Sequence, residues 1–354
     1  MSDPLGRTLY RLGQGARVAG YWSQYLVSQR LTKPSMREGE DAEVEKAPAA
    51  GEREHFPNRK DILADLQALM ARDWANIDAG VYRPPHDLLS GGLDALRGAP
   101  RFFREFSKVE ERRLARRHQE VFTPETRGRY PRYYLQNFHY QSGGWLSDES
   151  AAVYDHQVEV LFGGGSDAMR RQGLVPLQRF LAKRRSRDCH LVDLGTGTGR
   201  WLSFVKQNYP LMKVTGLDLS APYLEKAKAF LEPWRGVELL EAAAEKTGLP
   251  KASADVVSAV YLFHELPKKV RRQVAEEAAR ILKPGGLFLL VDSLQIGDRP
   301  DYDALLTRFP AHFHEPYYLD YIKSDLGSLF EDCGFEVESL DHAFLSRVLA
   351  CRKP

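Results

Sequence analysis

A glycine-rich turn is the part of this sequence whose residue types and spacing most clearly serve chemistry. An apolar run that ends at Leu194 leads directly into Gly195-Thr196-Gly197-Thr-Gly199. Glycines permit positive φ and carry no Cβ, so the backbone can press against a bound molecule and present the amides of the following helix start. The pattern therefore indicates a nucleotide-type cofactor at the carboxyl end of a first parallel strand.

The spacing of these glycines differs from that of a dinucleotide site. In the dinucleotide pattern Gly-x-Gly-x-x-Gly, the third glycine seats a helix under a pyrophosphate. Here Asp193, two residues before the first glycine, places a carboxylate beside the loop. A carboxylate attracts a cation and repels a pyrophosphate. We therefore expect a cofactor that carries a positive charge.

A second acidic residue stands at the separation that ribose binding requires. Residues 213–218 are typical of a second strand, which ends in Asp218, 23 residues after Gly195. An acid at about this distance accepts hydrogen bonds from both ribose hydroxyls. A glycine-rich turn alone is weak evidence, because such turns are common. The turn and Asp218 together are strong evidence for a nucleotide-type cofactor.

These features and three later segments resemble, in the same order, the class I S-adenosylmethionine-dependent methyltransferases. The later segments are Leu239–Pro250, Ala254–Pro267 and Ile281–Asp292, and the resemblance covers roughly residues 130–354. It implies S-adenosyl-L-methionine as the cofactor. The residues that it implies around the cofactor are Asp193, Gly195, Thr196, Gly197, Gly199, Asp218, Leu219, Ala244, Glu245 and Tyr261. Ala243 stands where the family often has Asp or Asn, so adenine must rely on the 244–245 backbone or on another donor.

Strands and helices alternate through this region. Strands are predicted at 189–194, 213–218, 237–241, 255–261, 286–292, 335–341 and 344–351, and helices near 169–184, 199–208, 221–231, 268–282 and 321–333. Such alternation requires a parallel sheet between helices. The last two strands lie too close for a crossover helix, so they are expected to pair antiparallel. The predicted fold is α/β, a Rossmann-like seven-stranded methyltransferase sheet with an antiparallel final strand and a helical N-terminal module. Residues 283–286, Lys-Pro-Gly-Gly, are expected to end a helix with a left-handed cap.

His264 is the candidate general base. Transfer of an activated methyl group requires alignment of the acceptor, exclusion of water and, for a hydroxyl or acidic carbon, removal of a proton. His264 follows the fourth strand, at the sheet edge where ligands bind. Its position resembles that of the catalytic histidine in plant small-molecule O-methyltransferases. Glu265 is expected to orient the ring or to contact the substrate, and the alternative role for His264 is a pocket wall.

Two aromatic segments are candidates for the acceptor site. Residues 130–185 are expected to form a lid and pocket segment, in which Tyr133, Tyr134, His139, Tyr140 and Trp145 can surround a sulfonium. The alternative is that these rings pack the N-terminal module against the core. In residues 312–318, His314 and Tyr317 are expected to contact the acceptor. No metal site is expected from His312, His314 and Glu315, because ligands on one loop lack a second half-site.

Residues 1–129 are expected to form the helical N-terminal module. One helical stripe is predicted from the spacing of Leu5, Leu9, Leu12, Ala16, Ala19, Trp22 and Leu26. Packing of this helix on the enzyme's own body is favoured over attachment to a membrane surface or partner. Residues 33–57 have the composition of a flexible linker. Further helices are predicted near 59–79 and 90–120.

Composition and missing motifs argue against a nucleic-acid partner and against a transmembrane segment. A net charge of +2 gives no general reason to expect a nucleic-acid partner, and glutamates interleave with the arginines of 112–117 as on a solvated face. The sequence also lacks the Asn/Asp-Pro-Pro-Tyr and Pro-Cys motifs of nucleic-acid base methyltransferases. Three scattered cysteines, no 18-residue apolar run and no signal peptide predict a cytoplasmic protein with reduced thiols, without a transmembrane segment.

The sequence therefore predicts an S-adenosylmethionine-dependent methyltransferase of a small, hydroxylated or amphiphilic metabolite. Its motifs resemble the broad group that includes ubiquinone and menaquinone methyltransferases, although the signature segments of those enzymes are not recognisable here. The alternatives are a protein or RNA methyltransferase that docks through its N-terminal helices, and a non-catalytic cofactor-binding scaffold. The acceptor atom and the oligomeric state do not follow from the sequence.

Overall fold

Seven strands form one sheet in the order β3-β2-β1-β4-β5-β7-β6. A computed structural model describes residues 3–32 and 56–354, so nearly all of the expected linker at 33–57 lies outside the described residues. The strands are β1 His190–Leu194, β2 Lys213–Asp218, β3 Val237–Glu241, β4 Ala254–Val260, β5 Leu282–Ser293, β6 Glu336–Ala343 and β7 Ser346–Arg352. Every predicted strand is present, with small differences at the ends.

The pairing of the strands confirms the predicted sheet type. The pairs from β3 through β5 are parallel, whereas β7 lies antiparallel between β5 and β6. Leu191 and Val192 of the central strand are fully buried, as expected for a strand covered on both faces. The parallel strands β1, β2 and β4 therefore end at the same edge of the sheet, and the segments that follow them meet there.

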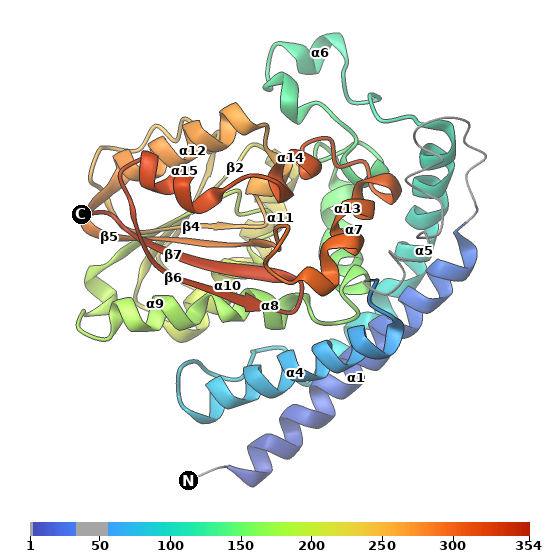
Figure 1. The fold of residues 1–354 in the computed structure, drawn as a ribbon, viewed down its shortest axis with the longest axis horizontal. Coiled ribbons are helices and arrows are strands. Elements are labelled where there is room, and N and C mark those ends of the chain that lie inside the picture. The colour runs from blue at the N-terminus through green and yellow to red at the C-terminus, as the bar shows by residue number, and fades with distance from the viewer. Residues whose placement is uncertain (1–2, 33–55) are drawn as a thin grey trace.

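Helices cover both faces of the sheet (Figure 1). On one face, a core forms under α9 Leu174–Leu181, α10 Arg200–Asn208 and α11 Ala221–Leu231. On the other face, the core lies under α12 Lys268–Ile281, α14 Tyr318–Ile322 and α15 Leu326–Asp332. The short helices α6 Pro124–Arg127 and α8 Ser166–Gln172 and the longer α13 Asp303–His312 complete this part of the chain.

Two predicted helices are interrupted. The helix expected at 169–184 is divided at Gly173, where an added Cβ would lie 2.9 Å from the Val291 side chain and 3.1 Å from that of Trp201. Close packing on the sheet thus requires glycine at the break. The helix expected at 321–333 begins only at Leu326, because the side chain of Asp325 accepts a hydrogen bond from the Ser328 amide and caps that end.

The Lys-Pro-Gly-Gly segment at 283–286 does not cap a helix, so that expectation was wrong. Helix α12 ends at Ile281, and the extended Leu282 donates its amide to the Ala278 carbonyl. The segment instead begins β5. Gly285 has φ +70°, and the pairing of β5 with β4 is irregular at this end. The glycines therefore serve an irregular strand start.

The N-terminal helices pack on the rest of the chain. They are α1 Pro4–Leu31, α4 Arg59–Asp78 and α5 Gly91–Ala115, and α1 lies against α5 and α7 Asp148–Leu161 (Figure 1). The expected apolar stripe does not form the contact, since Leu5 and Leu12 are 70% and 67% exposed. The buried face contains Tyr10, Gly13, Gln14, Arg17, Tyr21, Gln24 and Ser28. Among the described helices, none is long and apolar enough to cross a membrane.

A buried ion network joins α1 to the helices that cover the seven-stranded sheet. The Arg17 guanidinium lies 3.1 Å from Asp87, 3.0 Å from Glu159 and also contacts Asp167. Arg200, the first residue after the glycine-rich turn, binds the same two aspartates, Asp87 and Asp167. Polar partners thus determine which face of α1 is buried, because an unpaired buried charge is costly.

Candidate functional site

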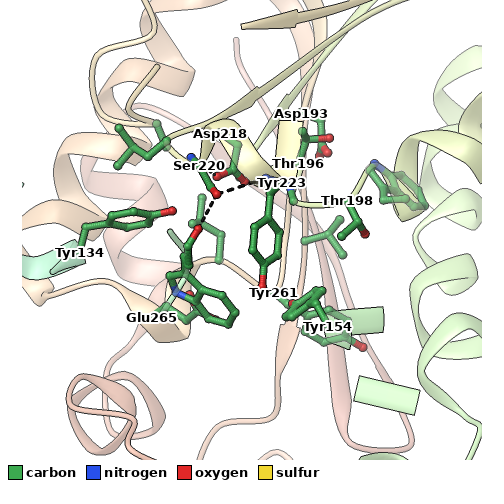
Figure 2. A pocket seen from close by; sticks show the side chains of 18 of the residues that line it. Tyr134, Tyr154, Asp193, Thr196, Thr198, Asp218, Ser220, Tyr223, Tyr261 and Glu265 are labelled. Atoms are coloured by element: carbon green, nitrogen blue, oxygen red, sulfur yellow. Dashed lines mark hydrogen bonds between the residues drawn. The ribbon is translucent and has the colours of Figure 1, made fainter. Parts of the chain in front are cut away.

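A pocket lies at the carboxyl ends of β1, β2 and β4 (Figure 2). Its wall includes Tyr133, Tyr134, Phe138, Trp145, Tyr154, Arg170, Asp193, Gly195, Thr196, Gly197, Thr198, Asp218, Leu219, Ser220, Tyr223, Ala244, Tyr261 and Glu265. This is the edge at which ligands bind in open α/β sheets. Most of the residues predicted around a cofactor therefore share one cavity.

The three glycines of the turn have different tasks. Gly195, Gly197 and Gly199 all have positive φ, at 68°, 54° and 79°. An added Cβ would lie 2.9 Å from Leu262 at Gly195 and 2.7 Å from Leu231 at Gly199, whereas at Gly197 it would meet nothing within 4 Å. Gly197 thus faces open space in the pocket. Gly199 is not in the pocket wall and instead starts α10, which differs from its predicted cofactor contact.

Asp218 connects the end of β2 with the glycine-rich turn. Its carboxylate accepts hydrogen bonds from the amides of Gly197 at 2.8 Å and Ser220 at 2.9 Å. Burial raises the pKa of Asp218, and these backbone hydrogen bonds oppose the rise. A carboxylate offers about four acceptor positions, so two hydroxyls of a ribose fit the remaining ones. The arrangement suits the predicted cofactor.

Asp193 is a buried carboxyl group in the same wall. It is 1% exposed, and its Oδ1 accepts a hydrogen bond of 2.7 Å from the Ser258 hydroxyl. Burial raises the pKa of Asp193 to about 7, although the hydrogen bond from Ser258 opposes the rise. A cation beside this group favours its charged form, so the environment of Asp193 fits a positively charged ligand.

Aromatic rings cover the pocket. Tyr133, Tyr134 and Trp145 line it as predicted, but His139 and Tyr140 do not. Trp145 makes edge contacts with two tyrosines that the sequence analysis did not select, with ring centroids 5.4 Å from Tyr154 and 5.6 Å from Tyr223. Tyr154 lies in the segment 130–185 that was predicted to form a lid, whereas nothing in the sequence of α11 distinguishes Tyr223.

The loop after β3 contributes one of its two predicted contacts. Ala244 lines the pocket, but Glu245 does not. The hydroxyl of Tyr133 lies 2.8 Å from Glu245 Oε1 and donates a hydrogen bond to that carboxylate. Glu245 thus holds the aromatic cover against the β3 loop. Leu219 and Tyr261 line the pocket as predicted.

Glu265 lies in the pocket wall, whereas its neighbour His264 does not. The His264 Nδ1 is 2.6 Å from Asp292 Oδ1, and its Nε2 is 3.8 Å from Glu265 Oε1. Burial lowers the pKa of His264, but the nearby carboxylates of Asp292, Glu315 and Glu265 together outweigh burial and raise the pKa to about 10. The ring therefore carries its proton at neutral pH, whereas the predicted general-base role needs the neutral ring. Burial also raises the pKa of Glu265 well above its usual range.

The two residues of the 312–318 segment that were predicted to contact the acceptor lie outside the pocket wall. His314 stacks on His118 with ring centroids 4.1 Å apart, and its Nε2 lies 2.9 Å from Gln136 Oε1. The Tyr317 hydroxyl donates to the Tyr133 carbonyl at 3.4 Å. Neither residue is in the pocket wall. Glu315, which follows His314 in the sequence, instead contacts His139.

Comparison with known proteins agrees with this geometry. Residues 191–286 match the protein family described as "Methyltransferase domain". The chain is 36% identical over 152 residues to the ubiquinone/menaquinone biosynthesis C-methyltransferase UbiE of Syntrophotalea carbinolica, which covers 42% of this chain and 60% of that protein. It is 29% identical over 178 residues to the sarcosine/dimethylglycine N-methyltransferase of Halorhodospira halochloris, covering 48% of this chain and 61% of that protein.

The matches cover part of each protein. The chain spans about 61% of the length of the first curated relatives that it matches. Among solved structures, a SAM-dependent methyltransferase from Aquifex aeolicus is 18% identical with a TM-score of 0.43, covering 59% of this chain and 100% of that chain. The N-terminal helices α1, α4 and α5 lie outside the matched family region.

Proposed function

We propose, from the premise that this chain carries a class I S-adenosylmethionine-dependent methyltransferase domain distantly related to UbiE, that it methylates a small-molecule acceptor. The acceptor class that fits best is a hydroxylated or amphiphilic metabolite. The observation that carries the proposal is that one pocket contains the open Gly197 backbone together with Asp193, Asp218 and Glu265. S-adenosyl-L-methionine supplies an activated methyl group on a positively charged sulfur.

Different residues of the pocket would bind different parts of the cofactor. When the cofactor is bound, Asp218 and the Gly197 backbone would hold its ribose, and Asp193 would favour its positively charged portion. The rings of Tyr134, Trp145 and Tyr154 exclude water and present π-faces to a cation. Binding of this kind would align the methyl group with an acceptor in the same pocket, whose wall also includes Glu265 and Tyr261.

A small acceptor is supported by the kind of pocket and by the relatives. The pocket is covered by aromatic side chains of the chain itself, which suits a small apolar or amphiphilic molecule. By their names, the relatives act in quinone biosynthesis and on sarcosine or dimethylglycine. These protein names differ in the acceptor atom, so we make no choice among O, N and C.

His264 remains the predicted proton-handling residue. Asp292 fixes its ring through Nδ1, so that Nε2 faces Glu265 and the pocket side. As a base, His264 has to release its own proton first. In the protonated form it stabilises negative charge on an acceptor oxygen. Both roles require the Asp292 contact.

Labelled cofactor identifies the acceptor class. The full-length protein is incubated with methyl-labelled S-adenosylmethionine and fractionated cell extract. Label in small, organic-soluble material supports the proposal, whereas label retained on RNA or polypeptide supports a macromolecular acceptor. Tight binding of the cofactor without transfer to any fraction would support the non-catalytic scaffold. An Asp218→Ala variant, which should transfer no label, controls for contaminating enzymes.

A further inference from the structure

We propose that His139, Glu265 and Glu315 form a binding site for one divalent cation at the edge of the cofactor pocket, where the cation holds an oxygen atom of the acceptor. One potential ligand atom from each of the three side chains lies within 4.8 Å of the others. Cation binding stands on this geometry alone, and only the contact with the acceptor rests on the proposed function.

The buried carboxylate of Glu315 points to a missing ligand. Its side chain has 0% exposure, and one carboxylate oxygen contacts His139 Nε2. The other oxygen, Oε2, is buried without a hydrogen-bond partner in the described part of the chain. A buried carboxylate oxygen is normally paired or bound to a metal. A cation between Glu315, His139 and Glu265 would satisfy this atom.

The three ligands come from three separate segments. His139 lies in the turn Phe138–Tyr140, Glu265 in the turn Phe263–Glu265 that follows β4, and Glu315 just before α14. No two of them are neighbours in the sequence, and the set differs from the metal set that the sequence analysis rejected. Glu265 also lines the cofactor pocket. The cation would therefore lie where an acceptor approaches the methyl group.

The chemistry of the ligands limits the cation. Imidazole suits zinc and iron, and carboxylates suit manganese and magnesium, so one histidine with two glutamates fits a first-row divalent ion such as Mn²⁺, Fe²⁺ or Zn²⁺. Three protein ligands leave coordination positions open for oxygen atoms. A cation with open positions orients a bound substrate. The inferred acceptor accordingly binds through one or two oxygen atoms.

Mn²⁺ titration tests the site without any catalytic readout. The full-length protein is treated with a chelator and titrated with Mn²⁺, while the electron paramagnetic resonance signal of free Mn²⁺ is followed. We expect one Mn²⁺ bound per chain, and binding at least about tenfold weaker in Glu315→Gln and His139→Gln. The matched control is Glu276→Gln, which changes an exposed glutamate and should bind as the wild type does.

Folding and cofactor binding are measured on the same variants. Circular dichroism establishes that each variant is folded, and His139→Gln, at a partly exposed side chain, decides the question if Glu315→Gln does not fold. Absence of stoichiometric Mn²⁺ binding to the wild type, or equal affinity in all variants, overturns the cation site. If the wild type binds Mn²⁺ but does not bind S-adenosylmethionine, the proposed function is overturned and the cation site is not.

Discussion

The amide of Gly197 donates a hydrogen bond of 2.8 Å to the carboxylate of Asp218, and this contact joins the glycine-rich turn after β1 to the end of β2. The same carboxylate lines the pocket. Asp218 therefore shapes the turn and also lines the ligand pocket. A substitution at this position should weaken cofactor binding more than it destabilises the sheet.

Asp218→Asn is expected to weaken cofactor affinity strongly. The amide of asparagine carries no charge and offers one acceptor oxygen where the two backbone amides need two. Loss of hydrogen bonds to a charged group costs about 1.5–3 kcal/mol, or about 10- to 150-fold in Kd. Calorimetry with S-adenosylhomocysteine measures the change. Glu241→Gln, at the end of the neighbouring strand β3, is the control, and equal affinities in both variants would contradict this role.

Cofactor affinity is expected to rise with pH between 6 and 7.5 because of Asp193. Its pKa is about 7 in the buried site, so at pH 6 about a tenth of the groups carry the charge that favours a cation, and apparent affinity falls in proportion, about tenfold. Asp193→Asn removes the ionisation and should bind weakly without this dependence. Fluorescence titration at several pH values measures the slope, and an identical slope in the variant would contradict the assignment.

The same raised pKa has the opposite effect on the stability of the unliganded protein. Between its ordinary value of 3.8 and about 7, Asp193 holds its proton in the folded state and loses it in the unfolded state. The folded state therefore binds more protons in this window, and the contribution of Asp193 to the free energy of unfolding falls as pH rises.

Arg17→Ala is expected to destabilise the whole chain. The change leaves the buried carboxylates of Glu159 and Asp167 without one of their positive partners, which costs about 3–5 kcal/mol. Denaturant unfolding followed by circular dichroism measures the loss. Arg30→Ala, an exposed residue of the same helix, should change stability little, and equal effects of the two substitutions would refute the importance of the network.

His264→Ala is expected to lower turnover by about 10²–10⁴-fold, the range for loss of acid-base assistance, while the Kd for cofactor stays near that of the wild type. The ring is not part of the pocket wall and contacts Asp292, so its removal leaves the ribose contacts intact. Single-turnover assays and calorimetry separate the two quantities. Normal turnover would remove His264 from the chemistry.

Local sequence patterns were sufficient for the sheet and for most of the cofactor wall. The strands at the centre of the sheet, β1, β4 and the second half of β5, are largely apolar. The turn at 195–199 and Asp218 lie at the ends of neighbouring parallel strands, so the sheet itself brings them together. Contacts between distant segments were not predictable in this way. The cluster of His139, Glu265 and Glu315 depends on three turns that meet only in the folded chain.

The face of α1 illustrates a second limit. Its leucine stripe predicted the buried side, but Leu5 and Leu12 are exposed, while Arg17 is buried among Asp87, Glu159 and Asp167. Hydrophobic periodicity assumes that burial is apolar. Here charge pairing with residues far along the chain determined which face of α1 is buried. The sequence of α1 alone does not show which residues those partners are.

The identity of the bound cofactor is measured by calorimetric titration of the full-length protein. We expect one S-adenosylmethionine or S-adenosylhomocysteine bound per chain and no binding of a nicotinamide or flavin dinucleotide. Clear heat with a dinucleotide, and none with S-adenosylmethionine or its demethylated product, would show that the pocket does not belong to a methyltransferase.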